Sequence, residues 1–314
     1  MTLRTASRKA PPTEEEVVGY MDSLSNWGRW GREDFMGTLN FITPEKRLKA
    51  LKLVKEGVTV SCERPIMYDD YPVGLRFPTK HFMQSTGEGE DPHGSNDFIM
   101  IGLHGGQIIT HMDSPCHMFY NKSMYNGHPA NLVTLEDGAK QGAIDLLGNG
   151  IVTRGVLLDV ARVMGKKWLE PGEAIFPEDL EAAEKAEGVR VESGDVLCFR
   201  TGYTLWMREN GHPKDRRWPG LQAACLPWLR ERGVAVLGGD CPNDVSPSGY
   251  EKPSTLPVHL VALVAMGLWL LDGANHEDLS AACQQRNRWE FLLSIAPLKL
   301  TAATGSPVNP LAMF

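Results

Sequence analysis

Two histidines and an aspartate fall close together in the stretch from Gln107 to His117, and residues of these types can bind a metal ion or move a proton. His111 and Asp113 are two positions apart, so on an extended strand both side chains point to the same face. An imidazole beside a carboxylate forms the first half of a site for zinc or manganese. Gln107, four positions before His111, shares that face if the strand is regular.

His117 follows Pro115, which lacks the amide proton that strand pairing needs and therefore turns the chain. The turn can bring His117 back over the metal as an acid or base that is not a ligand. A plainer interpretation stands beside this one, because a buried histidine is most often a hydrogen-bonded core residue. The carboxylate of a His-x-Asp pair can also simply fix the ring tautomer. Spacing alone leaves the metal-binding and structural interpretations equally open.

The stretch resembles the signature of the cyclase-like metal-dependent hydrolases, the family of bacterial kynurenine formamidase and isatin hydrolase. That signature reads His-x-Gly-Thr-His-x-Asp-x-Pro-x-His, and five residues match it in register: Thr110, His111, Asp113, Pro115 and His117. Two positions depart from it. Gln107 stands where the family has its first metal-binding histidine, and Ile109 stands where the family has glycine.

The resemblance implies a metal site made by His111, Asp113 and Gln107, with Asp272 completing a further position. A glutamine oxygen can ligate a hard ion such as Mn²⁺, but it is a weaker, neutral ligand for Zn²⁺. His104, which two glycines follow, is an alternative ligand if the loop bends. We therefore expect a divalent metal, Mn²⁺ or Zn²⁺, as the cofactor.

The family also places a histidine, and twelve or thirteen residues later a glutamate or glutamine, at the metal site. His259 matches the first, and Asp272, thirteen positions on, matches the second with a shorter acid. The resemblance implies His117 as the catalytic acid–base and His259 as a second catalytic residue, which donates a hydrogen bond to a developing oxyanion. The alternatives are a surface histidine at a helix start and a turn aspartate before Gly273.

Aromatic residues in two places are candidate substrate-binding residues. Trp27 and Trp30 stand among glycines in a tightly turned segment, where the resemblance implies shaping of the substrate pocket beside a neighbouring subunit. Phe119 and Tyr120 come directly after His117 and could floor a planar substrate. The alternative for all four is ordinary core packing, which the sequence alone favours.

Composition excludes several classes of function. The 314-residue chain has a formal net charge of −7 and a sequence pI near 5.7, so we expect neither a nucleic-acid surface nor an anionic-membrane surface. Six scattered cysteines without a CxxC pair indicate free thiols in a reducing, cytoplasmic compartment. The basic N-terminus lacks the apolar segment of a signal peptide, and the apolar run 256–271 is too short and interrupted for a membrane span.

Helical and strand patterns alternate along the chain. Residues 1–16 are polar and predict a flexible N-terminal arm, so residues 17–314 form a single domain. Residues 67–96 are rich in Pro, Gly, Asp and His and predict a long loop or lid. Helices are expected at 44–57, 177–188, 223–232 and 257–266, and strands at 58–62, 97–103, 156–160, 193–200, 234–237 and 268–272.

The resemblance implies an α/β fold, the swivelling β/β/α cyclase-like architecture, with a mixed β-core and outer helices. It implies metal-dependent hydrolysis of an amide or cyclic amide, of the N-formyl arylamine or lactam type, by a homodimer or homotetramer. Serine-triad chemistry is not expected, because the chain has no Gly-x-Ser-x-Gly elbow. Two alternatives stay open: a lactone hydrolase or cyclase/dehydratase on the same scaffold, and a metal-free relative that binds a small aromatic ligand.

Overall fold

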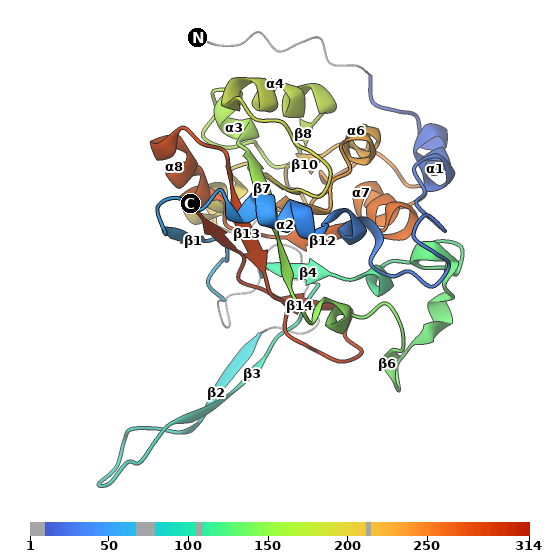
Figure 1. Cartoon of the computed structure of the whole chain (residues 1–314). Coiled ribbons are helices and arrows are strands. Elements are labelled where there is room, and N and C mark those ends of the chain that lie inside the picture. Colours follow the sequence, from blue (N-terminus) through green and yellow to red (C-terminus); the bar gives the residue numbers. More distant parts are fainter. Residues whose placement is uncertain (1–9, 67–78, 105–108, 212–214) are drawn as a thin grey trace.

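A nine-stranded mixed sheet forms the centre of the computed structural model, which describes residues 10–66, 79–104, 109–211 and 215–314 (Figure 1). The strand order is β1-β15-β13-β7-β9-β11-β12-β4-β14. Four neighbouring strands run parallel: β7 (Ile151–Leu158), β9 (Val196–Phe199), β11 (Val236–Gly239) and β12 (Trp269–Asp272). The flanking strands are antiparallel to their neighbours: β13 (Glu290–Ile295), β15 (Leu311–Met313) and β1 (Thr59–Ser61) on one side, β4 (His111–Asp113) and β14 (Gly305–Pro307) on the other. The expected α/β class with a mixed β-core is confirmed.

Helices cover both faces of the sheet because its central strands are apolar on both faces. Along β9, Val196 and Cys198 join one hydrophobic cluster, whereas Leu197 and Phe199 join the other. One cluster is completed by α1 (Glu14–Ser23), α3 (Val160–Val163), α4 (Pro177–Glu187), α5 (Tyr203–Asn210), α6 (Cys225–Arg232) and α7 (Pro257–Leu260). The other is completed by α8 (Glu277–Arg286) and the short helices η1 (Gly37–Phe41) and η5 (Ile144–Leu147).

Two helix starts follow from capping residues. Helix α2 (Pro44–Leu51) begins as predicted, with Thr43 as N-cap, but it ends before the predicted limit at Gly57. Helix α1 begins at Glu14, because Thr13 and Glu16 form a capping box. The assignment of residues 14–16 to a flexible arm was therefore wrong, and residues 1–9 lie outside the described part of the chain.

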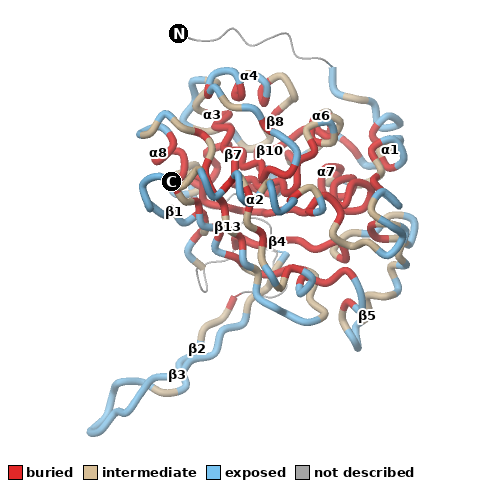
Figure 2. Tube along the Cα trace, in the orientation of Figure 1, coloured by how far each residue is buried: buried red, intermediate tan, exposed pale blue. Residues whose placement is uncertain are grey.

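The predicted loop 67–96 contains a strand that the sequence analysis missed. Residues Lys80–Ser85 form β2, which pairs antiparallel with β3 (Asn96–Met100), and residues 67–78 are not described. We call the hairpin of residues 80–100 the β2–β3 arm. It projects from the body as a long two-stranded ribbon whose surface is mostly exposed (Figures 1 and 2).

A rare helix type lies behind the candidate histidine His259. The helix predicted for 257–266 begins as α7 and continues as a π-helix, η6 (Val261–Met266), which Gly267 ends in the left-handed conformation. The end of a helix leaves carbonyl groups without internal partners. Here the segment 26–38 supplies donors to four successive carbonyls: Trp27 Nε1 to Val264 (2.6 Å), Asn26 N to Ala265 (2.9 Å), Asn26 Nδ2 to Met266 (2.7 Å) and Thr38 N to Gly267 (2.9 Å).

Two further expectations concern the cysteines and membrane association. All six cysteines are free and buried in the structure, as their scattered spacing predicted. Among the described residues, no helix has both the length and the apolar character that a membrane crossing requires.

We expect Asn26→Ala to lower the free energy of unfolding by about 1–3 kcal/mol, because the Met266 carbonyl loses a buried donor. Urea unfolding followed by circular dichroism measures the change. Asn210→Ala is a matched control: the Asn210 side chain donates to the Trp206 carbonyl on an exposed helix end, and we expect a change within about 0.5 kcal/mol. Equal, small changes in the two variants would contradict this role of Asn26.

Candidate active site

Strand β4 places His111 and Asp113 deep in the sheet, between β12 and β14. His111 lies opposite Asp272 on β12, and Asp113 lies opposite Gly305 on β14. Both side chains are almost completely buried. The two-residue spacing therefore does what the sequence analysis predicted: it directs an imidazole and a carboxylate to one face of a strand.

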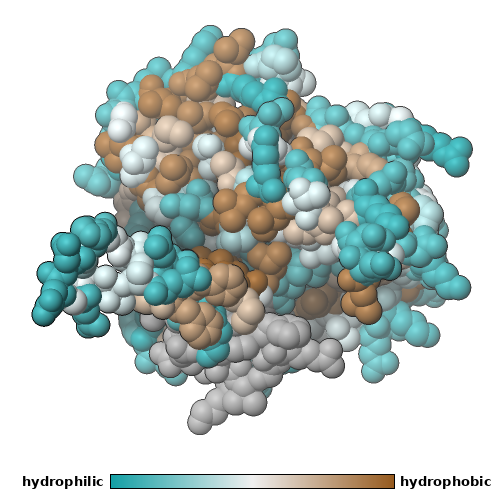
Figure 3. All heavy atoms as spheres, turned by 90° about the horizontal axis from the view of Figure 1, so that it is seen from below, coloured by the Kyte–Doolittle hydropathy of each residue, from teal (hydrophilic) through white to brown (hydrophobic). Residues whose placement is uncertain are grey.

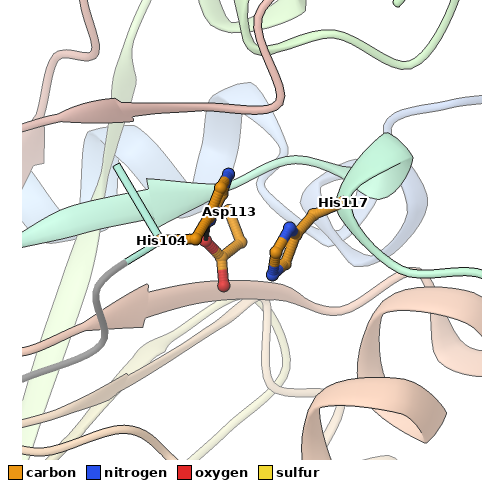
Figure 4. A group of neighbouring side chains, drawn as sticks. All are labelled: His104, Asp113 and His117. Atoms are coloured by element: carbon orange, nitrogen blue, oxygen red, sulfur yellow. Dashed lines mark hydrogen bonds and ion pairs between the residues drawn. The ribbon is translucent and has the colours of Figure 1, made fainter. Parts of the chain in front are cut away.

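The Asp113 carboxylate is the centre of a group of histidines (Figure 4). Its Oδ1 lies 3.0 Å from His104 Nδ1 and 3.3 Å from His111 Nε2. Its Oδ2 lies 3.7 Å from His259 Nε2 and accepts no hydrogen bond from any described residue. Burial alone would raise the pKa of Asp113, but the surrounding histidines hold that pKa well below its ordinary value. Asp113 is thus a buried carboxylate with one oxygen left unpaired.

His111 is fixed in one orientation by the backbone. Its Nδ1 lies 2.8 Å from the Ile109 carbonyl, to which it donates, so Nε2 faces Asp113. Burial opposes a charged ring, but the charge and hydrogen bonding of Asp113 outweigh it and raise the pKa of His111 to about 9. The position therefore favours positive charge, either a proton or a cation in its place.

His117 sits at the end of a short 3₁₀ helix, η2 (Pro115–His117), and its ring stacks on His104 with centroids 3.7 Å apart. Within the described part of the chain, no hydrogen bond fixes either nitrogen of His117, whereas His104 also contacts Thr304 Oγ1 at 2.7 Å. Burial lowers the pKa of His117 to about 4, against the attraction of Asp113. His117 is consequently neutral near pH 7 and able to accept a proton.

His259 and Asp272 lie on the other side of Asp113. His259 Nε2 is 3.0 Å from Asp272 Oδ2, and His259 Nδ1 is 2.5 Å from Asp244 Oδ2. Asp244 also accepts the backbone amides of Val258 and His259 at 2.6 and 2.9 Å. Burial disfavours the charged ring, but Asp272 and Asp244 raise the pKa of His259 well above its ordinary value. Asn243 completes the arrangement by donating from Nδ2 to Asp272 Oδ1 at 2.5 Å.

Asn243 and Asp244 were missed as site residues, since the sequence analysis weighed Asp244 only as a loop-fixing residue. They follow β11, which runs parallel to β12 and therefore ends at the same edge of the sheet as Asp272. Residues just beyond the carboxyl ends of neighbouring parallel strands collect at one place, and ligand sites of α/β sheets form there. That rule was the signal available in the sequence.

Two groups of described residues have the composition and spacing to hold a divalent ion. One is His111, Asp113 and Asp272, and the other is His104, Asp113 and His117; in each, the candidate ligand atoms lie within 4.8 Å of one another. Imidazole and carboxylate donors suit Zn²⁺ and Mn²⁺. The unpaired Asp113 Oδ2 supports the fit, because a buried carboxylate oxygen needs a partner. Gln107, the predicted first ligand, lies outside the described residues.

The predicted substrate-binding aromatics lie in other contacts. Trp27 donates to the Val264 carbonyl, and Trp30 packs edge-on against Phe41 with centroids 5.1 Å apart. Phe119 is exposed, and Tyr120 packs against the hydrophobic cluster that contains α7. Among the described residues, no ring contact or hydrogen bond joins these four side chains to the histidines around Asp113. Their substrate-binding role stays a prediction.

The chain was compared with known families and structures. The profile of the family Cyclase, described as "Putative cyclase", matches residues 48–243. A solved structure described as a novel cyclase is 30% identical, with a TM-score of 0.84 over 92% of this chain and 99% of that chain. Comparison with curated proteins found no match.

Two more distant solved structures share the fold. Isatin hydrolase A from Ralstonia solanacearum is 22% identical, with a TM-score of 0.58 over 81% of this chain and 91% of its own. A predicted metal-dependent hydrolase from Bacillus stearothermophilus is 18% identical, with a TM-score of 0.52 over 82% of this chain and 98% of its own. The family profile and the 30% identical structure together show that the chain belongs to the cyclase family.

Proposed function

We propose that the protein is a divalent-metal-dependent hydrolase that acts on an amide or cyclic amide. The observation that carries this proposal is Asp113, a buried carboxylate that three histidines surround and whose Oδ2 has no hydrogen-bond partner among the described residues. Such a group is costly to bury without a cation. The six free thiols favour a cytoplasmic location.

His111, Asp113 and Asp272 are the residues that would hold the ion, as Mn²⁺ or Zn²⁺. A divalent ion bound there supplies a Lewis acid that polarises a carbonyl group and makes water easier to deprotonate. The Ile109 carbonyl presents the His111 Nε2 lone pair, and Asn243 holds the Asp272 carboxylate. Both supporting contacts orient ligand atoms before any ion binds.

Proton transfer falls to His117 in this proposal. Its ring is neutral near pH 7 and no described hydrogen bond occupies its nitrogens, so it can take a proton from attacking water and return it to the leaving nitrogen. His259, held by Asp244 through Nδ1, directs Nε2 toward Asp113 and Asp272 and can donate to a developing oxyanion. The backbone contacts of Asp244 fix where that donor points.

The substrate class is proposed to be an N-formyl arylamine or a lactam. Support comes from the shared fold with isatin hydrolases, since isatin is a cyclic amide. The same residues could open a lactone or drive a cyclisation or dehydration, and comparing turnover of matched lactam and lactone substrates separates these reactions. A metal-free relative that binds a small aromatic ligand is the other alternative, and metal analysis separates it.

We expect about one divalent ion per chain in freshly purified protein, because one triad of ligand atoms is preformed around Asp113. Inductively coupled plasma mass spectrometry measures it. His111→Ala should lose the ion and the activity together. His93→Ala, which changes an exposed histidine on the β2–β3 arm, should lose neither. Full activity in metal-free protein that is insensitive to EDTA would rule out the proposed chemistry.

His117→Ala should keep its metal while kcat falls by roughly 10²–10⁴-fold, the usual contribution of a positioned acid–base. In the wild type, kcat/KM should fall as the pH drops through the pKa of His117, near 4, because the protonated ring no longer accepts a proton. That acid limb should be missing in His117→Ala. If this variant instead loses its metal as readily as His111→Ala, His117 is a ligand of the His104–Asp113–His117 group.

Asp244→Asn should lower kcat/KM by about 10–100-fold, because the His259 ring loses the carboxylate that fixes its Nδ1 proton. Asp240→Asn is the matched control: Asp240 is buried in the same loop but bonds Thr201 and Gly202 instead of a site histidine. We expect that control to lose stability and keep activity per folded molecule. Equal activity losses in the two variants would refute the positioning role of Asp244.

A further inference from the structure

The β2–β3 arm exposes an unusual amount of apolar surface. All five residues of β3 are exposed, and the two strands pair mainly with each other. The cross-strand register places Phe82, Phe98 and Met100 on one face of the ribbon and Met83 and Ile99 on the other. These five side chains are 42–54% exposed. An isolated two-stranded ribbon is marginally stable in water, so both apolar faces need a cover.

A second apolar surface lies at the same end of the body. It is made by Leu146 of η5 and by Leu298 and Leu300 of the loop before β14, which are 40%, 55% and 36% exposed. The two segments touch, since the Lys299 side chain packs at Gly148. We call these three leucines the leucine ledge. In the view from below, hydrophobic side chains gather beside the root of the arm (Figure 3).

The root of the arm and the ledge loop are connected through the candidate site. His104, four residues beyond the end of β3, contacts Thr304 at the end of the ledge loop. The arm itself leads away from the body (Figure 1), and from Lys80 to its tip near Gly89 it spans about 30 Å at 3.3 Å per residue. The arm thus leaves its own ledge uncovered and extends far enough to contact another molecule.

We propose that the β2–β3 arm docks on the leucine ledge of a second copy of this chain, and that the second arm docks reciprocally. A single chain carries both surfaces, so a two-fold exchange covers all four without any other protein. The eight side chains of arm and ledge hold on the order of 800 Å² of apolar surface per chain, which is what a standard interface buries. Each docked arm would then lie beside the candidate site of its partner.

Sedimentation velocity of the full chain tests this proposal without any substrate or metal. Wild type should sediment as a dimer. The double variant Phe82→Ser/Phe98→Ser should raise the dimer dissociation constant at least about 100-fold, because two central aromatic contacts are lost. The control Leu48→Ser/Leu51→Ser changes equally exposed side chains on α2, and its dimer should be unaffected. Circular dichroism checks that each variant is folded.

Cysteine cross-linking tests which surfaces meet. The native cysteines are buried, so Ile99→Cys and Leu298→Cys introduce accessible thiols. The variant with both substitutions should form an intermolecular disulfide, and each single variant should not. A wild-type monomer at tens of micromolar, a dimer that the arm variant does not weaken, or a dimer without the cross-link would each overturn the proposal. None of these outcomes bears on the proposed hydrolysis, which has separate readouts.

Discussion

A buried carboxylate surrounded by histidines is the constraint on which the rest of the site depends. Asp113 lies inside the sheet, where an unpaired anion costs several kcal/mol. His104, His111 and His259 approach it from three different segments, and one oxygen still lacks a partner. The histidines therefore concentrate positive charge, and the free oxygen leaves room for a cation. Metal-assisted hydrolysis follows from that electrostatic arrangement.

The topology of the sheet explains how the segments meet. Strand β4 enters antiparallel beside β12, so His111 falls opposite Asp272, and β11 ends one strand away with Asn243 and Asp244. Behind them, the π-helix after His259 is held at its carbonyl end by the segment 26–38. π-helices are often found at functional sites. The N-terminal segment thus acts on the site from a distance, through the helix that carries His259.

Local patterns predicted much of this arrangement. The His-x-Asp spacing placed two side chains on one strand face, Thr43 marked a helix start, and apolar runs located the central strands. Contacts between distant segments were not predictable in the same way. The bond of Asp244 to His259 and the cap of Asn26 on Met266 depend on how separate elements pack. Strand β2 was missed because Pro and Gly nearby suggested a loop, although Lys80–Ser85 is free of both.

The claim that Asp113 is the centre of a cation site is tested most directly by anomalous scattering from crystals of the purified protein. Difference maps collected on both sides of the Mn and Zn absorption edges show where such an ion lies and which element it is. We expect one strong peak within coordination distance of Asp113, His111 and Asp272, at about 2.0–2.2 Å from the ligand atoms. A map without such a peak, in which a protein donor occupies Asp113 Oδ2 instead, would contradict the account.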